Sequence, residues 1–114
     1  MISNAKITGV SLNMKNHGVL TFDISLEGCA WGCIYGGYVL GNGYLGAESF
    51  KGSDKSIECL MRIMDVIGVE SWEDLKGQYC RVKVGTFGDT ITTIGNIIED
   101  KWFDAKEFFN KNDE

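Results

Sequence analysis

A glycine-rich stretch interleaved with aromatic residues has the residue types that could bind a small anionic ligand. Seven of the fifteen glycines lie between residues 28 and 46. The aromatic residues among them are Trp31, Tyr35, Tyr38 and Tyr44. Glycine lets a phosphate approach the main chain, and aromatic rings stack on bases. The stretch lacks the Gly-Lys-Ser/Thr of a phosphate-binding loop, and no helix follows it directly as in a dinucleotide fingerprint. Two interpretations remain: a ligand surface, or a smooth strand face on which another chain or a tryptophan packs.

Two basic residues could add a phosphate contact to this surface. Arg81 and Lys83 share one face of a predicted strand with Tyr79. Such a row of cations can hold a phosphate, although it is more often a solvated face. The candidate ligand-binding residues are therefore Trp31, Tyr35, Gly36, Gly37, Tyr38, Arg81 and Lys83.

Residues suited to catalysis are sparse in this sequence. His17 is the only histidine, and its position between Asn16 and Gly18 is typical of a hairpin turn. There is no Gly-x-Ser-x-Gly motif and no catalytic motif around any cysteine. We therefore predict a protein that is not an enzyme and that uses no cofactor. A small nucleotide hydrolase is the less favoured alternative.

The four cysteines are Cys29, Cys33, Cys59 and Cys80. Cys29 and Cys33 lie in a predicted strand, where a rise of ~3.3 Å per residue would separate them by about 13 Å. The two sulfur atoms could then not both lie within ~2.3 Å of one zinc ion, the usual Zn–S distance. The N-terminus has no signal-peptide pattern, so a reducing cytoplasm is expected. We predict four free thiols and no bound metal.

The hydrophobic pattern predicts one α+β domain over residues 1–114. Alternation of apolar and polar residues predicts about five strands, at 5–14, 20–26, 30–40, 79–84 and 90–98. A hairpin turn at 15–18 and a glycine-rich loop at 41–52 follow from their turn residues. The strands are expected to form antiparallel hairpins, with the first three as a meander and a bulge at Gly95.

One main helix and a short C-terminal helix complete the predicted fold. Ser53 or Asp54 can cap the main helix, and Gly68 can end it. Its predicted inward stripe is Ile57, Leu60, Met61, Met64 and Ile67. Ser71 with Asp74 resembles the capping box of a short helical turn, and Asp104 with Glu107 predicts the start of the C-terminal helix.

Charge and C-terminal aromatic residues bear on the expected partners. The net charge of −5 argues against nucleic-acid binding, which needs a basic surface. No apolar run approaches the ~20 residues that span a bilayer, so no membrane association is expected. The C-terminal segment has more aromatic residues than a short terminal helix needs to pack, namely Trp102, Phe103, Phe108 and Phe109. With open sheet edges, they predict a homo-oligomer, most simply a dimer.

Four segments in order have the patterns HGxLT, GGY, GVxxWEDLKG and IGNIIxDxWF, beginning at His17, Gly36, Gly68 and Ile94. Together they resemble a small-protein family that recurs in tailed-phage and prophage genomes, and the likeness covers nearly the whole chain. The resemblance implies an accessory protein in the cytoplasm of an infected host, and it transfers no catalytic residue. By analogy with that setting, the expected function is counter-defence. The protein would sequester a host-derived small ligand, such as a cyclic or ADP-ribose-type nucleotide messenger. The alternative is a protein-binding inhibitor of a host defence complex.

Overall fold

The computed structural model describes residues 2–28, 31–43, 45–84 and 91–110 of the chain. Its strands are β1 (Ile2–Asn16), β2 (Val19–Gly28), β3 (Trp31–Asn42), β4 (Lys51–Gly52), β5 (Tyr79–Lys83), β6 (Thr93–Asn96) and β7 (Trp102–Asp104). Its helices are α1 (Asp54–Ile67), the 3-10 helix η1 (Trp72–Leu75) and α2 (Ala105–Asn110). The predicted α+β class is confirmed, and two short strands, β4 and β7, join the expected five.

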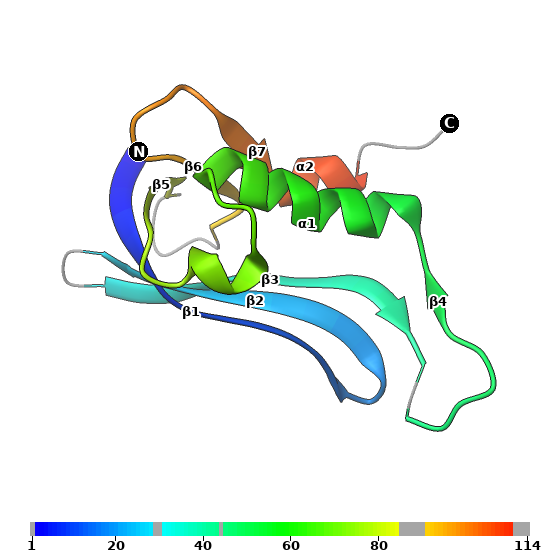
Figure 1. Cartoon of the computed structure of the whole chain (residues 1–114). Helices are drawn as coiled ribbons and strands as arrows, with labels where there is room; N and C mark the ends of the chain where they lie inside the picture. The colour runs from blue at the N-terminus through cyan, green and yellow to red at the C-terminus, as the bar shows by residue number, and fades with distance from the viewer. Residues whose placement is uncertain (1, 29–30, 44, 85–90, 111–114) are drawn as a thin grey trace.

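Within the described residues, the strands form one antiparallel sheet in the order β4-β3-β2-β1-β5-β6-β7. The long strand β1 joins the two halves of the sheet. Residues 2–6 of β1 pair with β5, and residues 6–16 pair with β2. A register shift between Ile7 and Gly9 marks an irregularity in β1, and bulges of this kind bend and twist a strand. The β5–β6–β7 half of the sheet rises above the β1–β2–β3 half, and α1 lies over the latter (Figure 1).

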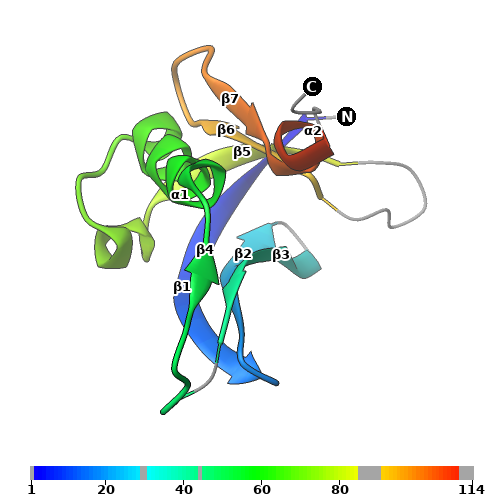
Figure 2. The ribbon, with the colours of Figure 1, turned by 90° about the vertical axis from the view of Figure 1, so that its right-hand side faces the viewer.

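The far ends of β1 to β4 project from the body of the molecule (Figure 2). We call this projection the arm and define it as residues 10–16, 19–22, 39–42 and 51–52. The arm contributes to an elongated shape, with extents of 45 × 32 × 31 Å. It therefore presents sheet surface that the helices do not fully cover.

Helix α1 begins and ends where the sequence predicts. The Ser53 hydroxyl accepts a hydrogen bond from the Ser56 N–H at 3.1 Å, which satisfies one of the free donors of the first turn. Gly68 has a φ of 96°, and its N–H donates to the Met64 carbonyl at 2.8 Å. The N–H of Val69 donates to the same carbonyl at 3.0 Å, so two bonds close the helix.

The inward face of α1 differs from the predicted stripe. Ile57 and Met61 are about 60% exposed, and Leu60 and Met64 are only half-buried. The buried residues of α1 are Ser56, Cys59, Ile63, Val66 and Ile67. The prediction was right for Ile67, wrong for Ile57 and Met61, and it missed Ser56, Cys59, Ile63 and Val66. Small side chains at positions 56 and 59 let the helix lie close against the sheet, and they turn its larger neighbours outward.

The core lies between the concave face of the sheet and α1. Its largest fully buried side chains are Tyr35, Phe22, Ile7, Ile24, Ile63, Leu75, Ile94 and Val82. They come from strands in both halves of the sheet and from α1 and η1. Truncating such a side chain to alanine typically costs ~2–5 kcal/mol, so this cluster holds the two halves together.

Three smaller expectations need correction. Ser71 makes no side-chain capping bond to the described residues, so the resemblance to a capping box was misleading. The strand predicted at 90–98 is the shorter β6, and Thr90 lies outside the described residues. Gly95 is not at a bulge, because it pairs in regular register with Arg81 and Trp102. Glycine is needed there because a side chain would collide with the Trp102 ring.

The described residues include no helix that is both long enough and apolar enough to cross a membrane.

Candidate functional site

Of the two tyrosines predicted to bind a ligand, Tyr35 belongs to the core and Tyr38 packs against it half-buried. Tyr35 is fully buried, and its hydroxyl donates to the Phe103 carbonyl at 3.5 Å. Burial raises the pKa of Tyr35 well above its usual range. The ring of Tyr38 stacks between Phe22 and Phe109, at 6.2 and 5.5 Å between centroids. These rings are therefore occupied by packing and are not presented to a ligand.

The neighbouring glycines serve the geometry of β3. Gly36 and Gly37 have φ angles of 133° and 81°, which side-chain-bearing residues rarely adopt. A side chain on Gly36 would also collide with the Phe22 carbonyl. The register of β2 and β3 shifts in this region, so the glycines mark an irregularity that close packing requires. Trp31 begins β3, and its side chain lies outside what the structure describes.

Arg81 and Lys83 lie on the opposite face of the sheet from these tyrosines. Cys80 and Val82 point into the core, so Arg81 and Lys83 point outward from the alternating strand β5. The structure thus brings Arg81 and Lys83 together, and it does not bring them to Tyr35. The ring that joins them is Trp102, whose centroid lies 4.7 Å from the Arg81 guanidinium carbon and 4.9 Å from Lys83 Nζ.

The guanidinium of Arg81 is committed to the main chain. Its Nε donates to the Asn96 carbonyl at 2.7 Å, and one terminal nitrogen donates to the Glu99 carbonyl at 2.8 Å. Both acceptors lie in the turn between β6 and β7. The expectation of a wet face was therefore wrong for Arg81, although Lys83 is exposed. Arg81 holds this turn in place, and two of its five N–H donors are used in doing so.

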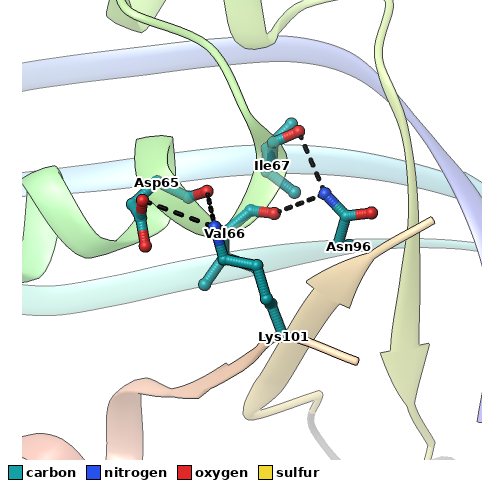
Figure 3. A network of polar contacts seen from close by, with 5 residues as sticks. All are labelled: Asp65, Val66, Ile67, Asn96 and Lys101. Atoms are coloured by element: carbon teal, nitrogen blue, oxygen red, sulfur yellow. Dashed lines mark hydrogen bonds and ion pairs between the residues drawn. The ribbon is translucent and has the colours of Figure 1, made fainter. Parts of the chain in front are cut away.

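The same turn is fastened to the C-terminus of α1 (Figure 3). Asn96 Nδ2 donates to the Val66 carbonyl at 2.9 Å, and Asn96 Oδ1 accepts from the N–H groups of Ile98 and Glu99 at 2.9 and 2.8 Å. Lys101 Nζ donates to the main-chain oxygen of Asp65 at 3.1 Å. Carbonyls in the last turn of a helix lack intrahelical partners, and here side chains from a distant turn supply them.

Next to Trp102, a hollow of about 340 Å³ opens between α1, β7 and α2. Its lining residues are Arg62, Trp102, Phe103, Asp104, Glu107 and Phe108. The Phe108 ring has Lys55 Nζ at 5.3 Å and the Arg62 guanidinium carbon at 5.8 Å from its centroid. Asp104 Oδ1 accepts from the Glu107 N–H at 2.9 Å, which caps α2 as the sequence predicts. Aromatic rings, cations and carboxylates therefore meet around one open hollow.

Part of this hollow carries a signal in the sequence. The aromatic residues between Trp102 and Phe109 predict a subunit interface from the sequence alone. In the structure Phe103 is buried and lies 5.3 Å from the Phe108 ring. Arg62 was not singled out, because only the tertiary fold brings α1 beside α2.

The described cysteines are poor nucleophiles. Burial raises the pKa of Cys59 and of Cys80 to about 12, and it also raises the pKa of Cys33. Such thiols stay protonated near neutral pH, and the thiolate is the reactive form. Cys29 lies outside the described residues.

The other groups suited to catalysis or metal binding stand apart from one another. His17 is exposed in the β1–β2 turn with a φ of 55°. Over the described ranges, no group of three or more His, Cys, Asp or Glu could hold a metal ion.

Comparisons with known proteins add no assignment. No protein-family model matches the chain, and neither a curated protein nor a solved structure shows significant similarity to it.

Proposed function

We propose that this chain is a non-enzymatic binding protein for a small anionic ligand of the nucleotide type, held in the hollow between α1, β7 and α2. The observation that carries the proposal is the convergence of Trp102, Phe108 and Arg62 on one hollow of about 340 Å³. Small-molecule sites commonly have volumes of ~300–1,000 Å³. A mononucleotide or a cyclic nucleotide is of suitable size for the lower end of that range.

Each lining group has a distinct part in this proposal. An aromatic ring that stacks on a base contributes ~1–3 kcal/mol. Phe108 and Trp102 both line the hollow, and the Trp102 ring also contacts Arg81 and Lys83, so Phe108 is the proposed stacking residue. Arg62 Nε pairs with Glu58, which leaves the terminal guanidinium nitrogens as donors to a phosphate. The carboxylates of Asp104 and Glu107 can accept from ribose hydroxyls or base amino groups. Acids beside a cation favour a whole nucleotide over a bare phosphate.

The biological setting is part of the proposal and rests on the family resemblance. A protein of this kind, produced by a phage in the cytoplasm of its host, would sequester a messenger nucleotide and so oppose host defence. The alternative, inhibition of a host defence complex by protein binding, remains a prediction. It would be favoured by an exposed apolar surface, and the arm presents one.

Calorimetric titration with a panel of cyclic mononucleotides, cyclic dinucleotides and cyclic ADP-ribose isomers tests the proposal. At least one member should bind with a Kd below ~10 μM. Arg62→Ala should weaken that binding by ~30-fold or more, because the loss of one charged partner in a partly desolvated site commonly costs ~2 kcal/mol or more. Lys15→Ala, which removes an exposed cation from the arm, is the matched control and should change nothing.

Two results would count against this site. If no member of the panel binds the wild-type protein below ~10 μM, the nucleotide proposal fails. If a ligand binds but responds to Lys83→Ala and not to Arg62→Ala, the ligand occupies the outer face of β5 that the sequence predicted.

A further inference from the structure

Two apolar hollows adjoin along the arm. The first, of about 350 Å³, lies between α1 and the arm, and its apolar lining includes Leu20, Leu40, Ile57 and Leu60. The second, of about 430 Å³, lies at the end of the arm, and its apolar lining is Leu12, Met14, Leu20 and Leu45. Because Leu20 lines both, we treat them as one surface and call it the arm groove.

The apolar side chains of this region are unusually exposed. Leu12, Leu45 and Ile57 have exposed fractions of 43%, 91% and 59%. Met61, one turn along α1 from Ile57, is 60% exposed and lies on the same side of the helix. Contiguous apolar patches of more than a few hundred Å² are rare on monomers and usually mark an interaction site.

We propose that the occupant of the arm groove is α1 of a second copy of this chain, in a two-fold symmetric dimer. Two-fold interfaces require a patch that complements itself. This patch carries both parts of such a match, since Ile57 and Met61 form a ridge on α1 and the groove lies beside them. The ridge of each copy would enter the groove of the other.

The charges around the groove are self-complementary as well. Lys15 and Lys51 lie on the arm, where each lines one of the two hollows. Asp54, at the start of α1, lines the first hollow together with Lys51. Glu58, next to Ile57, also pairs with Arg62 of its own chain. When α1 of one copy enters the groove of the other, its acidic residues approach the basic arm. Complementary charges of this kind set the register of an interface.

The apolar area approaches what a dimer needs. The four exposed residues and their half-buried neighbours form a patch of roughly a few hundred Å². The half-buried neighbours are Met14, Leu20 and Leu60. A stable dimer buries ~800 Å² per partner, and about 65% of a homodimer interface is apolar. Each copy therefore needs roughly 500 Å² of apolar area.

The interfaces that the sequence predicted are a sheet edge and the C-terminal aromatic residues. The β7 edge has three residues, and short edges resist pairing. The two-residue strand β4 pairs with β3 only at Gly41 and Asn42, so the rest of β3 is an open edge within the described sheet. The C-terminal aromatic residues are engaged within the chain, since Phe103 is buried and Phe109 stacks on Tyr38. The arm groove is the larger uncovered apolar surface.

Light scattering and sedimentation over a concentration series test the dimer. The wild-type protein at tens of micromolar should have twice the 12.6 kDa mass of one chain. Leu45→Ser and Met61→Glu should each raise the dimer Kd at least tenfold. Both residues are exposed, so the melting temperature extrapolated to the dissociated monomer should stay unchanged.

Ile98→Ser is the matched control, because Ile98 is 84% exposed in the turn after β6 and lies outside the groove. It should leave the dimer Kd unchanged. A wild-type protein that stays monomeric at 100 μM would overturn the proposal and leave the groove for a different protein. A dimer whose Kd is unchanged by Leu45→Ser and by Met61→Glu would also overturn the proposal, because the interface would then lie elsewhere. Neither outcome depends on the nucleotide titration.

Discussion

Asn96 joins the β6–β7 turn to the end of α1, and its replacement gives a sharp test of the fold. Asn96→Asp keeps the shape of the side chain and the oxygen that accepts from Ile98 and Glu99. It removes the amide that donates to the Val66 carbonyl at 2.9 Å. The new carboxylate would face the carbonyl end of the helix, where a negative charge is unfavourable.

The expected loss follows from these contacts. A hydrogen bond contributes ~0.5–1.5 kcal/mol net, and a charge at a helix terminus ~0.3–1 kcal/mol. Asn96→Asp should therefore lower the free energy of unfolding by about 2 kcal/mol at pH 7. With a urea m-value of ~1–3 kcal/mol/M for a small domain, the midpoint should fall by about 1 M.

Urea unfolding followed by tryptophan fluorescence measures this loss. Asn13→Asp is the matched control, because Asn13 Oδ1 also accepts a main-chain N–H, from Lys15 at 3.1 Å. Its amide makes a long contact of 3.5 Å with Ser11, so the control should change stability by less than ~0.5 kcal/mol at protein concentrations low enough for the chain to be monomeric. Equal small losses from both variants would refute the reasoning that the Asn96 amide stabilises the end of α1.

Four further predictions concern the faces of the elements and the buried thiols. Arg81→Ala should cost ~1–3 kcal/mol in urea unfolding, because two main-chain carbonyls lose a charged donor, and a loss below ~0.5 kcal/mol would contradict this role. Ile63→Ala should cost ~2–5 kcal/mol and Ile57→Ala under ~0.5 kcal/mol in the monomer, and the reverse order would mean that α1 is rotated. Cys59 and Cys80 should resist iodoacetamide at pH 8 in the folded protein and react after unfolding, and rapid reaction of the folded protein would contradict their burial. Their folded pKa values of about 12 exceed the usual 9.0, so the folded state binds more protons above pH 9, and the free energy of unfolding should fall from pH 9 to 12.

Several parts of the fold follow from local chemistry and were predictable from the sequence. The alternation of residues 20–26 predicted β2, because a strand places successive side chains on opposite faces. Ser53 and Gly68 predicted both ends of α1, because capping needs only a hydroxyl and a positive φ within one turn. Asp104 likewise predicted the start of α2. Each of these signals acts over a few neighbouring residues.

The partners of each side chain depended on contacts between distant parts of the chain. Arg81 was a reasonable phosphate ligand from its strand alone, yet the carbonyls that engage it come from residues 15 and 18 positions away. Tyr35 alternates like a surface residue on a glycine-rich strand, but α1 and α2 close over it. The hollow beside Trp102 needs Arg62 from α1, some 40 positions earlier in the chain. The sequence determined both ends of α1, the start of α2 and the alternation of β2, because those rules are local. Only the tertiary structure decided which face is buried and which residues meet, because packing selects among faces that local rules leave equivalent.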